Sequence, residues 1–183
     1  LVAATDNGMI YDHLKYQELI KDKNVDAIIF SFRHHISSKN NPEMYGWVKT
    51  DHKENAIGVS VKVPISDTPY EDHAIVGTFW FRRVELFEKA LQNLIDKNVR
   101  VNGEYYVDSL LSELIELGYK VKVFEVDDYI CWGTPNDYET FVYWQSFFHK
   151  CSFHPYSLEK DITVDKSKIE EIDAKYRKYK QEF

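Results

Sequence analysis

Four residues of the sequence combine types and positions that suit phosphate chemistry. Asp6 follows the apolar run LVAAT and precedes Asn7 and Gly8, as expected for a carboxylate that a buried strand delivers to a turn. Lys62 lies in VSVKVPISD shortly before a proline, and two strand-like apolar runs are interrupted by glycines, at positions 46 and 77. A carboxylate for Mg²⁺, a lysine for phosphate and bare backbone for a polar ligand together indicate phosphoryl or nucleotidyl transfer.

Each of these residues also has an ordinary structural interpretation. Asp6 fits an Asx turn or a helix cap. Lys62 fits a solvated strand edge, where a charge prevents aggregation, and the glycines Gly46 and Gly77 fit β-bulges. Taken singly, the structural interpretation is favoured at every position, so the prediction of chemistry depends on the combination.

Other catalytic signatures are absent from the sequence. It contains no P-loop, no G-x-G-x-x-G, no G-x-S-x-G elbow and no H-E-x-x-H. His34 and His35 are adjacent and point in opposite directions on an extended segment, which disfavours a shared metal site. Cys131 after an apolar strand indicates a buried, inert thiol, and the run FVYWQSFFH indicates packing along a helix.

Size and composition limit the class of protein. The 183 residues are 44% hydrophobic, enough for one domain with a substantial core. The net charge of −7 disfavours binding to nucleic acid or to an anionic membrane, although one phosphorylated ligand needs only one or two cations. With two cysteines, no leader-like start and no apolar run near the roughly 20 residues of a membrane span, we expect a cytoplasmic protein.

The elements that must position these residues alternate between strands and helices. We expect strands over residues 1–5, 25–33, 44–51, 56–63, 73–83 and 119–129. We expect helices over residues 13–23, 84–98, 107–118 and 135–149, a polar loop over 34–42, and a thin helical stripe in the charged tail 165–183. This order predicts an α/β domain with a mixed sheet that is covered on both faces.

In this order the segments resemble the sugar-phosphate nucleotidyltransferases, or NDP-sugar pyrophosphorylases. AATDNGMIYD resembles the family's Gly-Asp-x-Ile-Phe element, MYGWVKTD its Tyr-Gly-Val-Val element and SVKVP its Glu-Lys-Pro element. AIVGTFWFRR resembles Gly-x-Tyr-x-Phe, NGEYYVDSLLSELIELG resembles Gly-Glu-x-Tyr-x-x-Asp, and YICWGTPNDYETF resembles Trp-x-Asp-x-Gly-Thr-Pro-Glu-Asp. The resemblance implies a Rossmann-like, glycosyltransferase-A-type fold over residues 1–149. Residues 150–183 lie outside it, as a carboxyl-terminal extension that we expect to be helical.

The resemblance also implies roles for particular residues. Asp6 matches the family's aspartate that binds Mg²⁺, and Lys62 matches the lysine that meets the sugar phosphate, so both are expected to be catalytic. Gly46, Gly77 and Glu104, together with Lys62, are expected to bind the acceptor.

The sequence departs from the family at two of these elements. Cys131 aligns with the second metal aspartate, and a thiolate is a poor ligand for a hard cation. Either Asp127 or Asp128 substitutes, of which Asp128 is our predicted ligand, or the metal is held mainly by Asp6 and nucleotide phosphates. Val61 stands where the family often has a sugar-reading glutamate, which leaves the acceptor open and includes a polyol phosphate.

The family's phosphate loop, Gly-x-Gly-x-Arg, has no counterpart in this sequence. We therefore expect the chain to be the acceptor half of a longer nucleotidyltransferase, without its amino-terminal strands and inactive by itself. The intact enzyme is expected to transfer NMP from an NTP to a sugar 1-phosphate, releasing pyrophosphate. Assembly into a homo-oligomer is left open. The alternative is a non-catalytic regulatory or assembly module that retains the fold.

Overall fold

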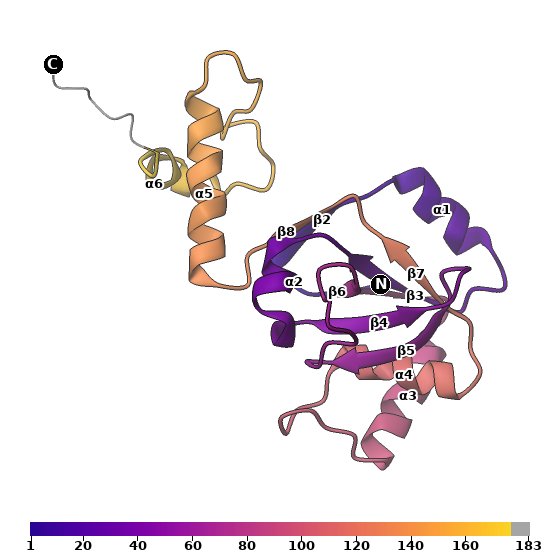
Figure 1. Cartoon of the computed structure of the whole chain (residues 1–183). Coiled ribbons are helices and arrows are strands. Elements are labelled where there is room, and N and C mark those ends of the chain that lie inside the picture. The colour runs from indigo at the N-terminus through magenta and orange to yellow at the C-terminus, as the bar shows by residue number, and fades with distance from the viewer. Residues whose placement is uncertain (177–183) are drawn as a thin grey trace, which may run out of the picture. The chain divides into compact units, whose positions relative to one another are not determined.

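The computed structural model describes residues 1–176 of the chain. These residues form two compact units, one spanning Leu1–Ile130 and the other beginning at Cys131 (Figure 1). The first unit contains a sheet with helices, and the second contains a long helix with short helices and loops folded against it.

The first unit is built on a six-stranded mixed sheet. Its central path runs in the order β5-β4-β6-β3-β7, and β1 also pairs with β6. β3 and β7 are parallel, and the other pairs in this sheet are antiparallel. The strands are β1 (Val2–Ala3), β3 (Ala27–Phe32), β4 (Gly46–Thr50), β5 (Ala56–Val61), β6 (His73–Phe81) and β7 (Val121–Glu125). The predicted α/β class with a mixed sheet flanked by helices is confirmed.

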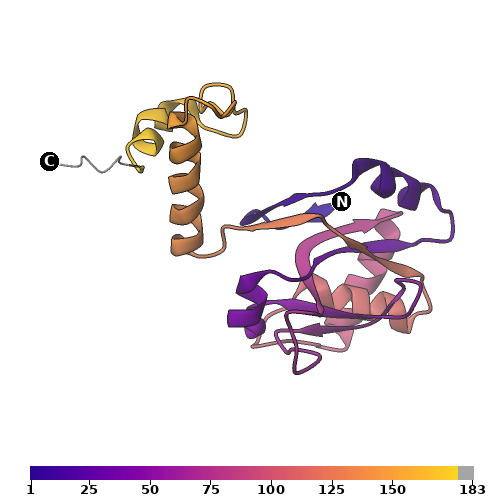
Figure 2. The same ribbon diagram turned by 45° about the horizontal axis from the view of Figure 1, so that its top comes forward.

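Helices lie on both sides of this sheet. α3 (Val84–Asp96) and α4 (Val107–Glu116) pack on one side, and α1 (His13–Lys21) lies on the other (Figures 1 and 2). These three helices were expected from the spacing of their apolar residues. Gly118 has a φ of +82°, the left-handed conformation that ends a helix at glycine.

The central strand β3 shows why both faces are covered. Ala27 and Ile29 belong to the core beneath α3 and α4, whereas Ile28, Phe30 and Phe32 belong to the core on the α1 side. Alternate residues of a strand point to opposite faces, so an uninterrupted apolar run needs two cores.

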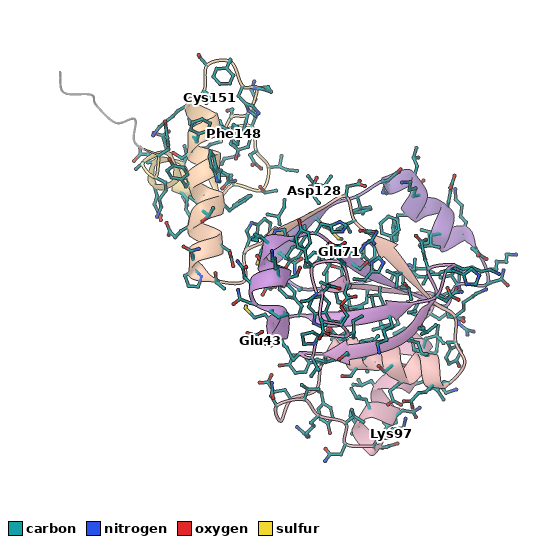
Figure 3. All side chains as sticks on the ribbon, viewed as in Figure 1. Glu43, Glu71, Lys97, Asp128, Phe148 and Cys151 are labelled. Atoms are coloured by element: carbon teal, nitrogen blue, oxygen red, sulfur yellow. The ribbon has the colours of Figure 1, made fainter. Side chains whose placement is uncertain are left out.

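The ends of α3 and α4 are joined by a charged contact. Lys97, labelled in Figure 3, lies just after α3 and its ammonium is 2.7 Å from carboxylate oxygens of both Glu113 and Glu116 on α4. The Glu113 side chain is only 4% exposed, so loss of the Lys97 ammonium would leave a buried carboxylate unpaired. This contact fixes α4, whose first turn carries part of the candidate site.

The strand expected over residues 119–129 is in fact two strands. Val126 donates its N–H to Ser31 O on β3 (2.8 Å), and the next residue, Asp127, donates to Ile10 O (2.8 Å). The chain thus passes from the main sheet to a second, two-stranded sheet made of β2 (Asn7–Ile10) and β8 (Asp128–Cys131). β2 was not expected, because NGMI contains a turn signal and only two apolar residues.

The prediction of a loop over residues 34–42 was also wrong in part. It contains a short helix, α2 (Ile36–Asn40), followed by a single 3₁₀ turn, η1 (Pro42–Met44). His35 accepts a hydrogen bond from Ser37 N–H and so caps α2, and the fixed φ of Pro42 suits the first position of η1.

The second unit is organised around α5 (Pro135–Lys150), which begins at the proline as expected and is capped by the Thr134 hydroxyl. Its core contains Val142, Leu158, Val164 and Ile172. The tail holds a 3₁₀ turn, η2 (Lys166–Lys168), and α6 (Ile169–Asp173). We expected a division after residue 149, where the family resemblance ends, and this position lies inside α5. As a domain boundary it stays a prediction, and residues 177–183 of the predicted tail lie outside the described residues.

Candidate functional site

The β4–β5 hairpin brings Gly46 and Lys62 together. Gly46 pairs with Val61 across the hairpin, and Lys62, the next residue, donates its N–H to Tyr45 O (3.0 Å). Lys62 has a φ of +63°, a left-handed conformation that costs an ordinary side chain about 1 kcal/mol or more. The hairpin therefore holds this lysine in a strained and defined position at the end of β5.

The Lys62 side chain turns back over the site. Its ammonium donates a hydrogen bond to Met44 O (2.5 Å) and lies 5.6 Å from the centre of the Tyr106 ring. A cation within about 6 Å of an aromatic face is attracted by the electron density of the ring. These contacts hold a positive charge beside the backbone of Gly46.

A tight turn positions Glu104 and Tyr106. Val101 and Glu104 exchange backbone hydrogen bonds of 3.0 Å, and the central Asn102 and Gly103 both have positive φ, +51° and +83°. Asn-Gly is the preferred pair for such a turn, because both residues tolerate the left-handed region. Tyr106 then donates its hydroxyl to Glu104 Oε2 (3.1 Å), and this bond raises the pKa of the tyrosine because it stabilises the protonated phenol.

Asp108 completes this group from the first turn of α4. A Cβ atom built on Gly46 would lie 2.0 Å from Asp108 Oδ2 and 3.1 Å from Ile75 Cδ1, so the carboxylate fills the space that the glycine leaves. Burial raises the pKa of Asp108 to about 6, against the opposing effects of its own N–H and the Lys62 charge. We call Gly46, Lys62, Glu104, Tyr106 and Asp108 the acceptor cluster.

Sequence reasoning found three of these five residues. Gly46, Lys62 and Glu104 were predicted, and the structure brings them together. Tyr106 and Asp108 were not singled out, although both lie in the segment NGEYYVDSLL that carries part of the resemblance. The Gly-Glu-x-Tyr-x-x-Asp pattern marks Glu104 and Tyr106, but its aspartate position falls on Ser109, so the pattern gave no signal for Asp108.

Asp6 and Gly77 belong to a second region. Asp6 is exposed in a bend between β1 and β2, and its side chain has no hydrogen-bond partner among residues 1–176. The bend is held from both sides, because Ala4 N–H donates to Gly77 O (2.9 Å) and the Asn7 amide donates to Val76 O (2.9 Å). We call residues 4–7 with Gly77 the Asp6 bend.

Gly77 accommodates protein at this bend. It has a φ of +92°, and a Cβ there would lie 3.1 Å from Ala4 Cβ. The pairing of β3 with β6 shifts register between Ile29 and Ser31, opposite this glycine, so Gly77 lies at a β-bulge. Its predicted contact with the acceptor stays a prediction, but Ile75, which touches the Gly46 position, lies only two residues away on β6. The two regions are therefore neighbours.

Asp128, labelled in Figure 3, lies at the opposite end of β2 from Asp6. It begins β8 directly after Asp127, which bonds to Ile10 at the carboxyl end of β2, whereas Asp6 precedes the amino end. A four-residue strand is about 13 Å long, so the two carboxylates do not converge on one ion. Among residues 1–176 no group of three or more His, Cys, Asp or Glu side chains is arranged to hold a metal ion.

Cys131 is partly buried in the second unit. Its thiol lies 3.4 Å from Asp137 Oδ2, which also accepts a hydrogen bond from the Thr134 hydroxyl (2.6 Å). The Thr134 hydroxyl in turn caps α5 by accepting from Asp137 N–H (3.2 Å). These contacts place Cys131 in a helix-capping arrangement at the start of α5.

The fold is similar to that of a known enzyme structure. The crystal structure of the nucleoside-diphosphate-sugar pyrophosphorylase from Vibrio cholerae RC9 superimposes with a TM-score of 0.55 and 20% sequence identity. The match covers 74% of this chain and 52% of that one, so this chain spans about half the length of that protein. No protein-family model and no curated protein matches the sequence.

This similarity establishes the fold and its class. At 20% identity it shows a shared arrangement of strands and helices, and function must be argued from the residues themselves. Within the described part of the chain, no helix combines the length and apolar character needed to cross a membrane.

Proposed function

We propose that this chain forms the acceptor half of a nucleotidyltransferase. The reaction would transfer NMP from an NTP to a sugar 1-phosphate, or a similar phosphorylated acceptor, and release pyrophosphate. The observation that carries the proposal is the acceptor cluster, in which a strained lysine next to the partner of Gly46 on the hairpin lies near the Tyr106 ring and the Asp108 carboxylate. The similarity of this fold to that of the Vibrio cholerae pyrophosphorylase supports the proposal.

The cluster residues would act by positioning and charge. Lys62 would exchange its bond to Met44 O for the acceptor phosphate, and so reduce the repulsion between this anion and the incoming nucleotide. The Gly46 backbone and Glu104 would orient the rest of the acceptor, so that a phosphate oxygen of the acceptor faces the α-phosphorus in line. Displacement of pyrophosphate by that oxygen needs no covalent intermediate on the protein.

Asp6 would hold Mg²⁺ in this proposal. An exposed carboxylate without a hydrogen-bond partner among residues 1–176 fits a cation that takes one or two protein ligands and completes its shell with phosphates and water. When bound, the ion would neutralise charge on the phosphates. Asp128 does not fit the same ion as Asp6, so the alternative with Asp6 and nucleotide phosphates as the main ligands is preferred.

The test is an assay of the full-length protein that contains this chain, against a panel of NTPs and sugar or polyol phosphates. We expect pyrophosphate release with one pairing, and losses of about 100-fold in kcat/KM for Asp6→Ala and Lys62→Ala, as is usual when a charge on the transition state is lost. Asp67→Ala and Lys49→Ala, which alter exposed residues of the same unit, serve as matched controls.

Each outcome decides a separate part of the proposal. Absence of transfer with every pairing would overturn the enzyme and favour the regulatory or assembly module. Full activity of Asp6→Ala would remove Asp6 from the metal role, and full activity of Lys62→Ala would remove the lysine from the acceptor phosphate.

A further inference from the structure

The position of the Asp108 carboxylate is defined by Gly46. Any other residue at position 46 would place its Cβ 2.0 Å from Oδ2 and 3.1 Å from Cγ of Asp108. Gly46 is itself buried at the start of β4. The carboxylate is therefore packed against the same backbone that the proposed function assigns to the acceptor.

The Asp108 carboxylate is half-buried and has few protein partners for its charge. An ionised carboxylate has about four lone-pair sites for hydrogen bonds. Within residues 1–176, no other residue donates a hydrogen bond to it, and the Lys62 ammonium is bound to Met44 O. Burial of a charge without partners is unfavourable, and the raised pKa of Asp108 has the same physical cause.

The neighbouring charges limit what could satisfy this carboxylate. A phosphate group would be repelled by it, and fits Lys62 instead. A divalent cation needs several ligands, and no group of three or more acidic, His or Cys side chains is arranged for one in the described part of the chain. A hydroxyl group is a neutral donor that suits the carboxylate.

We propose that Asp108 is a specificity-determining residue that accepts a hydrogen bond from a hydroxyl group of the acceptor. This inference rests on the proposed function and deepens it. The acceptor is then a phosphorylated polyhydroxy compound, a sugar phosphate or a polyol phosphate, whose phosphate pairs with Lys62 and whose hydroxyl meets Asp108. Glu104, which accepts a hydrogen bond from the Tyr106 hydroxyl, would bind a second hydroxyl.

A purely structural role for Asp108 makes a different prediction. An acidic residue in the first turn stabilises a helix through its dipole, and that role would not distinguish one phosphate ester from another. The experiment must therefore compare ligands that share the phosphate and differ in their hydroxyl groups.

The test measures binding to the 183-residue chain by NMR titration, with glucose 1-phosphate, glycerol 3-phosphate, methyl phosphate and 2-aminoethyl phosphate as probes. We expect at least one of the two hydroxylated esters to bind about tenfold more tightly than methyl phosphate, which is the usual contribution of a hydrogen bond to a charged group. Asp108→Ala should remove this preference and leave the binding of methyl phosphate unchanged. Lys62→Ala should weaken all four probes, and Asp67→Ala should change none.

A second variant keeps the test decisive if Asp108→Ala perturbs the fold. Asp108→Asn has the same shape without the charge, and we expect it to reduce the preference by a smaller factor while its NMR spectrum stays native. Retention of the full preference in Asp108→Asn and Asp108→Ala would overturn the inference and leave the proposed function intact. Tighter binding of 2-aminoethyl phosphate, which has an amine and no hydroxyl group, than of both hydroxylated esters would also overturn it.

The two proposals fail in distinguishable ways. If none of the phosphate esters binds and the full-length protein shows no transfer, then the proposed function fails and this inference with it. If transfer is observed but the full-length Asp108→Asn enzyme keeps the same KM ratio between hydroxylated and non-hydroxylated acceptors, then only this inference fails.

Discussion

Gly46 and Gly77 lie on the neighbouring strands β4 and β6, and both were expected to leave bare backbone for a ligand. In the structure both spaces are filled by protein, but by different parts of it. The Asp108 carboxylate fills the space at Gly46, whereas the side chains of Ala4 and Asn7 lie at Gly77.

The groups that fill these two spaces differ in their capacity to bind a ligand. At Gly46 the occupant is a charged side-chain end with unused hydrogen-bonding capacity, which is what a ligand-binding group requires. At Gly77 the occupants are the side chains of Ala4 and Asn7, whose segment is already hydrogen-bonded to β6, and Asp6 between them is exposed. Under the proposed function, the acceptor cluster would recognise the acceptor, and the Asp6 bend would present a single carboxylate.

Gly46→Ala should have the largest effect on this comparison. The new methyl group would displace the Asp108 carboxylate, and we expect a loss of stability of about 3 kcal/mol, as for other overpacked sites. Urea unfolding followed by NMR signals of sheet residues would report the first unit separately from the second. Gly58→Ala on β5 is the matched control, because no atom lies within 4 Å of a Cβ at that position.

A double variant identifies the cause of the Gly46→Ala effect. If the clash with Asp108 is responsible, then adding Asp108→Ala should recover more than half of the lost stability. An unchanged loss in the double variant would show that Ile75, the other neighbour of this position, is the obstacle.

Asp108→Asn should have a pH-dependent effect of intermediate size. The native pKa of Asp108 is about 6 against an ordinary value of 3.8, so the folded protein binds more protons than the unfolded chain between these values and loses stability as the pH rises through them. The shift corresponds to about 3 kcal/mol, and we expect about 2 kcal/mol because the residue is partly accessible to water.

The sign of this effect distinguishes a recognition residue from a helix-stabilising one. Asp108→Asn should raise stability in urea unfolding at pH 7 and have little effect at pH 4, where the wild-type carboxyl is protonated. A variant that is less stable than wild type at pH 7 would instead show that the charge supports α4.

Compared with Gly46→Ala and Asp108→Asn, the substitution Gly77→Ala should have the smallest effect on the acceptor cluster. The positive φ and the Ala4 contact together should lower stability by about 1–2 kcal/mol, while the binding of phosphate esters to the chain stays within about threefold of wild type. Gly103→Ala, at a φ of +83° with no atom within 4 Å, measures the backbone strain alone. A loss of phosphate-ester binding in Gly77→Ala as large as in Gly46→Ala would contradict the separation of the two regions.

Much of this architecture was predictable from local patterns. The helical spacing of apolar residues in α3 and α4, the Pro135 start of α5 and the glycine at position 118 were each interpreted correctly, because these signals depend on neighbours in the sequence. β2 and the break before β8 were missed. Their existence depends on which strand a backbone N–H finds across the fold, as when Val126 bonds to β3 and Asp127 to β2.

The candidate site divides in the same way. Lys62, Gly46 and Glu104 were identified from residue type and order, whereas Asp108 became a candidate only through its contact with a glycine 62 positions away. Asp128 was chosen as a metal ligand from its proximity in sequence to Cys131, and the pairing of β8 with β2 places it at the far end from Asp6.

By itself, the amino-acid sequence determined the α/β class, the two-faced burial of the central strands and the presence of a lysine and glycines suited to a phosphorylated ligand. These follow from periodicity and residue chemistry, which are local. The tertiary structure alone decided which carboxylate meets which backbone. A contact such as Asp108 with Gly46 depends on the register of the β4–β5 hairpin and on the placement of α4, and long-range packing sets both.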